Sequence, residues 1–133
     1  MPLAGLVTVQ SSHDAATTLA RLTNALAAKG VTIFATVDHA AGAASVNMPL
    51  RATTVVVFGN PAAGTPLMQA AQTAGIDLPL KALVWQDANG VAHLGYNDPA
   101  WIAARHGINA NHPAVAGLTA VLANFAHHAT SGD

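Results

Sequence analysis

The stretch "LPLKALVWQDANGVAHLGYND", Leu78 to Asp98, predicts a β-hairpin. Two apolar runs of strand-forming character flank Asn89-Gly90, and this dipeptide is a strong short-range signal for a tight hairpin turn. The two strands of a hairpin pair antiparallel and need no helix between them. The hairpin therefore argues against a doubly wound parallel sheet, in which a helix separates consecutive strands.

The segments on either side extend this pattern into an α+β fold. Apolar runs predict further strands, and capped or proline-led segments predict helices. The expected order is β-α-β-β-α-β-β-α-α, which indicates a two-layer sandwich of a mainly antiparallel sheet with helices packed on one face. We expect one α+β domain over residues 1–133, with a tail that frays after about residue 128. The expected strands are 3–10, 31–39 and 51–60 besides the hairpin, and the expected helices lie within 11–30, 60–75, 98–107 and 113–130.

Two local patterns lead to specific expectations. Residues 31–38 alternate strictly, so Val31, Ile33, Ala35 and Val37 are expected on one side of a half-buried strand. The next segment, "AAGAASVNMPL" at 40–50, has small residues and reads as a flexible loop.

Composition excludes several classes of function. The 133 residues include 8 % charged residues, no cysteine and a formal net charge of −1, so neither a nucleic-acid-binding surface nor a thiolate site is expected. No signal peptide and no membrane span are predicted, which favours a cytoplasmic protein, with a mature periplasmic form as the alternative. A weakly charged surface also favours self-association, and we expect a homodimer.

Polar side chains gather at two strand ends. Asp38-His39 ends the second strand, where the pair is suited to metal binding or proton transfer, or simply to capping. In "FGNPAAGTP", Asn60, Gly64 and Thr65 precede or begin a helix, where they either bind an anion or form a cap and turn. The seven histidines show no helical zinc spacing, so no structural metal is expected.

A third cluster lies around the hairpin. Lys81 occupies an otherwise apolar strand, Tyr96 stands at the strand exit, and Arg105 and His106 end the helix that follows. We hypothesise that Lys81, Tyr96 and Arg105 converge on one pocket, with His39 or His106 beside it, and bind a polar or anionic ligand. The alternative is structural: Lys81 reaches solvent and Arg105 pairs with an aspartate.

Four blocks of the sequence resemble the signature of the domain of unknown function 302 family, a set of small bacterial and archaeal proteins. They are "IFATVDHAAGAA" (33–44), "FGNPAAGTPLMQ" (58–69), "DLPLKALVWQD" (77–87) and "YNDPAWIAARHG" (96–107). The resemblance covers about residues 6–108 and implies an α+β fold in a family with dimeric members. It brings no established activity and no compartment, because members occur alone or behind export signals. One departure is Ala52 after Arg51, where the family usually has proline.

Three functions remain open at this level. The first is a small homodimeric domain that binds a polar or anionic ligand, or a metal, through the family-like positions. The second is an interaction module without a small-molecule site. The third is an enzyme with a His/Asp base and a Lys/Arg anion clamp, which the scarcity of acid and base groups argues against. No cofactor is identified by the sequence. The candidate ligand-binding residues are Lys81, Tyr96, Arg105, His106, Asp38, His39, Asn60, Gly64 and Thr65.

Overall fold

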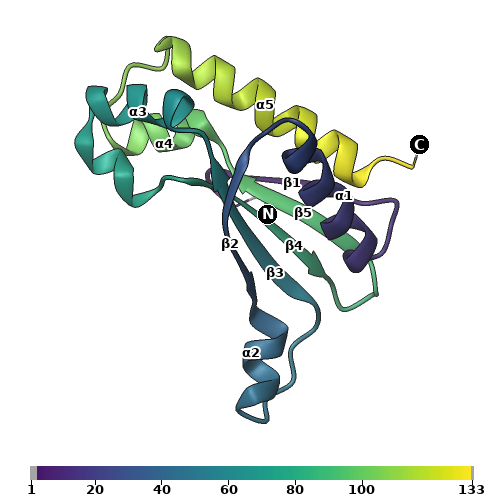
Figure 1. The fold of residues 1–133 in the computed structure, drawn as a ribbon. Coiled ribbons are helices and arrows are strands. Elements are labelled where there is room, and N and C mark those ends of the chain that lie inside the picture. Colours follow the sequence, from purple (N-terminus) through teal and green to yellow (C-terminus); the bar gives the residue numbers. More distant parts are fainter. Residues whose placement is uncertain (1–2, 133) are drawn as a thin grey trace.

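The computed structural model describes residues 3–132, and the predicted hairpin lies in the interior of its sheet (Figure 1). Strands β4 (Leu80–Gln86) and β5 (Ala92–Asn97) pair antiparallel, with Leu83 opposite Gly95. The amide of Asp87 donates to the Val91 carbonyl at 2.8 Å, and Gly90 adopts a φ of 81° that suits glycine in the turn. The sheet order is β1-β5-β4-β3-β2, and each neighbouring pair is antiparallel.

The order of elements agrees with the expected one, apart from two additional short helices. The strands not yet named are β1 (Leu6–Gln10), β2 (Thr32–Asp38) and β3 (Thr53–Gly59), and the helices are α1 (Ala15–Ala28), α2 (His39–Ser45), α3 (Pro61–Ala70), the 3₁₀ helix η1 (Gln72–Ile76), α4 (Pro99–Arg105) and α5 (Pro113–Thr130).

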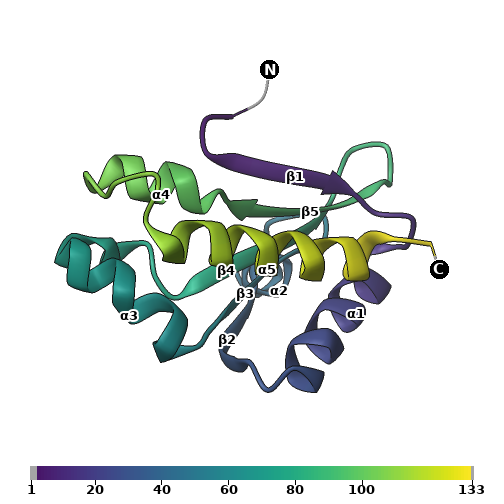
Figure 2. The same cartoon turned by 90° about the horizontal axis from the view of Figure 1, so that it is seen from above.

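The longer helices lie on one face of the sheet, as Figure 2 shows. Alternate residues of the inner strands, such as Val56 and Phe58 of β3, point into this layer and are buried. Leu26 of α1 and Leu118 and Leu122 of α5 complete the core from the helical side. The two-layer α+β sandwich predicted from the sequence is confirmed. In residues 3–132 the opposite face of the sheet carries no helix layer.

Residues 40–50 do not form the flexible loop that we expected. The Asp38 carboxylate accepts a hydrogen bond from the Ala41 amide at 2.9 Å, and this cap starts helix α2. The run of alanines then favours the helix enough to outweigh Gly42. Helix α2 lies at the tip of a projection formed with the ends of β2 and β3 (Figure 1), and none of its residues is buried. We call residues 37–52 the arm.

The strict alternation expected in the second strand is broken by a β-bulge. Ile33 pairs with Phe58, but Ala35 pairs with the adjacent Val57, so Phe34 is an extra residue. Beyond the bulge the sides exchange: Ile33 faces the helices, whereas Ala35 and Val37 face away from them. Strand β2 is also an edge strand and is mostly exposed rather than half-buried.

The C-terminal end of α5 packs against the segment between β1 and α1. Helix α5 continues to Thr130, whose side chain is buried, and the amide of Ser12 donates to the Thr130 carbonyl at 2.8 Å. Within residues 3–132, none of the helices combines the length and the apolar character that crossing a membrane requires.

Candidate functional site

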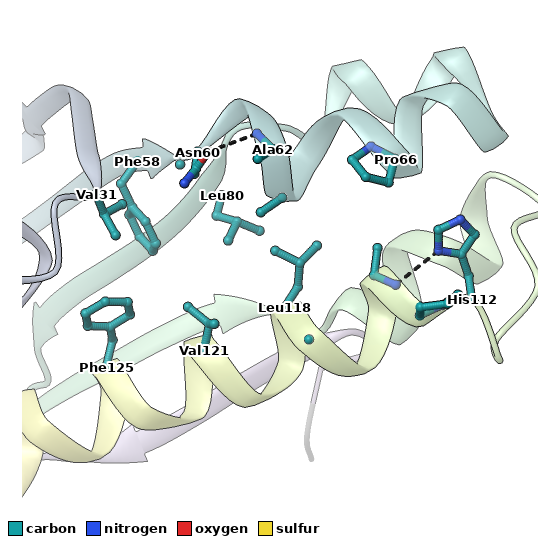
Figure 3. A pocket seen from close by; sticks show the side chains of 15 residues that line it. Val31, Phe58, Asn60, Ala62, Pro66, Leu80, His112, Leu118, Val121 and Phe125 are labelled. Carbon is teal, nitrogen blue, oxygen red and sulfur yellow. Dashed lines mark hydrogen bonds between the residues drawn. The ribbon is translucent and has the colours of Figure 1, made fainter.

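A pocket of about 720 Å³ lies between α3 and α5, above the ends of β3 and β4 (Figure 3). We call it the α3–α5 pocket. Phe58 and Leu80 come from the two strands, and Leu118, Val121 and Phe125 follow one another along α5. The lining is mostly apolar, because it is the continuation of the hydrophobic core to the surface.

The pocket is open because the residues that face it across the gap are small. Helix α3 presents Ala62, Ala63 and Pro66, and the first turns of α5 present Ala114 and Gly117. None of these side chains is long enough to close the space between the two helices. Figure 3 shows Ala62 and Pro66 on one side of the gap and Leu118 and Val121 on the other.

Two capping residues supply polar atoms at the rim. Asn60 caps α3, with Oδ1 accepting from the Ala62 amide at 2.9 Å. His112 caps α5, with Nδ1 accepting from the Ala114 amide at 3.1 Å. An imidazole whose Nδ1 accepts carries its proton on Nε2 when neutral. Within residues 3–132 neither Nε2 of His112 nor the Asn60 amide nitrogen has a hydrogen-bond partner, so both are available as donors to a ligand.

A smaller hollow of about 330 Å³ lies on the other side of the first turn of α3. Gly64 and Thr65 line it together with Met68 and Leu78, and Asn60 borders both hollows. The predicted residues Asn60, Gly64 and Thr65 therefore lie together at the start of α3, beside apolar space.

Three other predicted residues meet at Asp77, which the sequence reasoning missed. Arg105 Nη1 lies 2.8 Å from Oδ1 of Asp77, and His106 Nε2 lies 2.6 Å from Oδ2. The Lys81 ammonium donates to the backbone carbonyls of Asp77 at 3.4 Å and Pro79 at 3.1 Å. Asp77 stands in the family-like block before β4. It is one of only six acidic residues in the chain, and this scarcity was the signal in the sequence that could have identified it.

Both ring nitrogens of His106 are occupied. Nδ1 lies 2.8 Å from the Thr73 hydroxyl, and Nε2 contacts the Asp77 carboxylate. The guanidinium of Arg105 also lies over the Trp101 ring, 5.8 Å from its centroid. The cluster is thus internally paired, and it joins the end of α4 to the segment before β4.

Tyr96 does not join this cluster. It pairs with Ala82 in the hairpin, and its side chain is buried under the helices, whereas the neighbouring Lys81 lies on the opposite face of β4. Burial, assisted by the negative charge of Asp98, raises the pKa of the Tyr96 phenol above its usual value. The expected convergence of Lys81, Tyr96 and Arg105 on one pocket is therefore wrong for Tyr96.

Asp38 and His39 lie in the arm, at the end of the sheet from which α2 projects (Figure 1). The Asp38 carboxylate is engaged as the cap of α2. In the part of the chain that the structure describes, no three histidine or aspartate side chains are grouped so that they could hold a metal ion.

Comparison with known proteins places this fold in a family. The pattern of the family described as "Domain of unknown function DUF302" matches residues 7–125. The chain belongs to the DUF302 family. A crystal structure of an uncharacterised conserved DUF302 protein from Bacillus stearothermophilus superposes with a TM-score of 0.84 over 96 % of this chain and 99 % of that chain, at 19 % identity. That likeness supports the fold.

The DUF302 chain is also similar to part of longer curated proteins. It is 46 % identical over 104 residues to a protein named fluoride-specific ion channel FluC 1 from Brucella suis, covering 78 % of this chain and 41 % of that protein. The identity is the same for the Brucella abortus protein of that name, of which 38 % is covered. The chain spans about two fifths of the length of these relatives.

Proposed function

We propose that this DUF302 chain is a homodimeric domain that binds a small molecule in the α3–α5 pocket. The observation that carries the proposal is the pocket itself, which opens directly on the core and has two polar donors at its rim. Ligand sites in proteins are concave, mainly apolar and provided with a few orienting polar groups, with volumes of about 300–1,000 Å³. A pocket of about 720 Å³ lies within that range.

Among the predicted residues, we assign Asn60 to the ligand site, with His112 added. Gly64 and Thr65 line the smaller hollow beside it. We assign Lys81, Arg105 and His106 a structural role outside the ligand site. The Asp77 carboxylate already pairs with Arg105 and His106, and its backbone carbonyl accepts from Lys81. An anion arriving there would compete with a carboxylate that is already in place. At the rim of the α3–α5 pocket, by contrast, the donors of Asn60 and His112 are unpaired within the described residues, so no internal carboxylate competes with a ligand there.

Titration with the fluorescent dye anilinonaphthalene sulfonate tests the pocket. We expect the folded protein to bind the dye and the Gly117→Leu variant to lose binding. A Cβ atom at Gly117 meets no atom within 4 Å, so leucine enters open pocket space and, as a better helix former, does not weaken α5.

Gly42→Leu is the matched control for this variant. Gly42 is also a helical glycine with nothing within 4 Å of a Cβ atom, but it lies in α2, outside the pocket lining. This variant should bind the dye like the parent. Failure of the parent to bind, or equal loss in both variants, would refute the pocket as a ligand site.

The dimer part of the proposal rests on surface area. A compact monomer of this mass exposes about 6,500 Å², whereas this chain exposes 7409 Å². The excess is close to the roughly 800 Å² that one partner contributes to a standard interface. The arm accounts for exposed apolar side chains that have no contact in the core, namely Val37, Val46, Met48 and Leu50.

We assign the arm to contact with a second copy of this chain. Helix α2 has seven residues, and a helix of this length is marginal unless it packs against another element. The arm carries one acidic and one basic residue, Asp38 and Arg51, so two copies related by a two-fold axis meet without net repulsion.

Sedimentation equilibrium at micromolar concentration tests the dimer, which should have twice the 13.4 kDa mass of the chain. The double variant Val46→Asp/Met48→Asp should be monomeric. The Leu3→Asp variant, which changes an exposed apolar residue outside the arm, should remain dimeric. A monomeric parent protein, or equal behaviour of the two variants, contradicts this assignment.

An interaction module is the second candidate function, favoured by the Brucella relatives, in which the matched segment belongs to longer proteins. In that case the arm serves contact with another protein or another segment of the same chain. This alternative predicts that the parent protein is monomeric in sedimentation. It also predicts that Gly117→Leu does not reduce dye binding.

A further inference from the structure

We propose that the ligand of the α3–α5 pocket is a free long-chain carboxylate, which lies along α5 with its carboxylate group at Lys29. This rests on the proposed function, because it names the chemical class that the same pocket would accept. The argument depends on the length of the apolar space, on its lining and on the charge at its end.

The α3–α5 pocket continues past its own boundary. A neighbouring hollow of about 610 Å³ lies between α1 and α5. The two hollows share Val31, Val121 and Phe125, so they adjoin each other beside α5, and we call the two together the groove. In Figure 3, Leu118, Val121 and Phe125 follow one another along this helix, away from His112.

The middle of the groove is apolar and open. Val121 keeps 42 % of its surface exposed, although it lies between Leu118 and Phe125 in the groove. A bound hydrocarbon chain would remove this surface from water. An apolar chain that covers Leu118, Val121 and Phe125 in sequence is the shape that fits the lining.

The groove is long enough for an acyl chain. From Ala114 in the α3–α5 pocket to His128 in the outer hollow, helix α5 rises about 21 Å, at 1.5 Å per residue. One leaflet of a bilayer, whose hydrocarbon core is about 30 Å thick, has acyl chains that span about 15 Å. The groove therefore accommodates a chain of membrane-lipid length, rather than a short carboxylic acid.

The charge at one end selects the head group. Lys29 lies at the end of α1 and lines the outer hollow with Asn124 and His128. Neither hollow has a carboxylate in its lining, and within residues 3–132 the Lys29 ammonium has no ion pair. A single positive charge with amide and imidazole neighbours complements a ligand that carries one negative charge.

Isothermal titration calorimetry with laurate and with dodecanol tests both parts of the assignment. We expect laurate to bind, and hexanoate to bind far more weakly, with about a fourfold difference for each methylene group removed. Gly117→Leu should abolish laurate binding. Gly42→Leu should not.

The Lys29→Met variant tests the head group. It should weaken laurate binding by up to about fivefold, as expected for the loss of one solvent-exposed charged contact worth at most about 1 kcal/mol, and leave dodecanol binding unchanged. Arg105→Met, which removes a positive charge that lies outside the arm and outside both hollows, should affect neither ligand. Equal effects of Lys29→Met on the acid and the alcohol would overturn the role of Lys29.

Other outcomes separate this inference from the proposed function. If the dye binds and Gly117→Leu blocks it, but laurate does not bind, the pocket stands and the acyl ligand is refuted. Sedimentation with phosphatidylglycerol vesicles should leave the protein in the supernatant. If the protein instead binds the vesicles and Gly117→Leu prevents this binding, the occupant is a membrane lipid and the assignment of a free acid is wrong.

Discussion

Nε2 of His106 lies 2.6 Å from Oδ2 of Asp77, which joins the last turn of α4 to the segment that enters β4. The side chains of His106 and Asp77 are only 7 % and 12 % exposed, whereas that of Arg105, which also pairs with Asp77, is 49 % exposed. The His106–Asp77 contact is therefore the sheltered part of the cluster. Its contribution to stability is expected to exceed that of the Arg105 pair.

Asp77→Ala should lower the free energy of unfolding by about 1–3 kcal/mol, because it leaves a buried imidazole donor without its acceptor. Arg105→Met should cost less than about 1 kcal/mol, because a half-exposed ion pair is weakened by solvent. Urea unfolding followed by circular dichroism gives both values. Because Asp77→Ala removes both contacts, a loss for Arg105→Met as large as that for Asp77→Ala would show that the Arg105 pair dominates.

Gly5→Ala should be strongly destabilising. Gly5 has a φ of +75°, and a Cβ atom there would lie 2.3 Å from Cγ of Trp101. The positive φ and the steric overlap together should cost about 2–4 kcal/mol in unfolding free energy.

Gly30→Ala is the matched comparison for this position. Its φ is +69°, but nothing lies within 4 Å of a Cβ atom, so the loss should be about 1 kcal/mol, from the backbone alone. Equal losses at the two positions would mean that Trp101 moves aside without cost.

Tyr96 should make the protein less stable at alkaline pH. Burial raises the pKa of its phenol in the folded state above the unfolded-state value of about 10. The contribution of the neutral phenol to folding stability is therefore complete below the unfolded-state pKa and is lost as pH rises through the folded-state pKa. Tyr96 is the single tyrosine of the chain, so phenolate absorbance in a pH titration reports on it alone.

Tyr96→Phe removes the ionisable group and should flatten the alkaline limb of the stability profile. The core position keeps an aromatic ring of the same shape. An absorbance midpoint at the usual tyrosine pKa, or an unchanged alkaline limb in Tyr96→Phe, would contradict this explanation.

Chelation should leave thermal stability unchanged. The histidines of residues 3–132 are dispersed, and none is grouped with two other histidine or aspartate side chains that could share an ion. Differential scanning calorimetry with and without EDTA is the measurement. A large fall in Tm after chelation would point first to His39, which follows Asp38 in the sequence, and to His106, which contacts Asp77.

Local signals in the sequence determined most of the fold. Asn89-Gly90 specified the hairpin, Asp98 specified the start of α4, and Gly107 ended that helix with a φ of +70°. Each of these signals works within a few residues, through a turn conformation or a side-chain cap, so it can be recognised without knowing the rest of the molecule. The antiparallel sheet and the single helical layer followed from them.

Tertiary structure alone decided what these elements bring together. Asp77 meets Arg105 and His106 because η1 and α4 are adjacent in space. The α3–α5 pocket is lined by small residues of both helices, such as Ala62 and Gly117. The bulge at Phe34, which exchanged the sides of β2, depends on pairing with β3. Contacts between distant segments depend on packing geometry, and the periodicity of one segment carries no information about the size of the space left between two others.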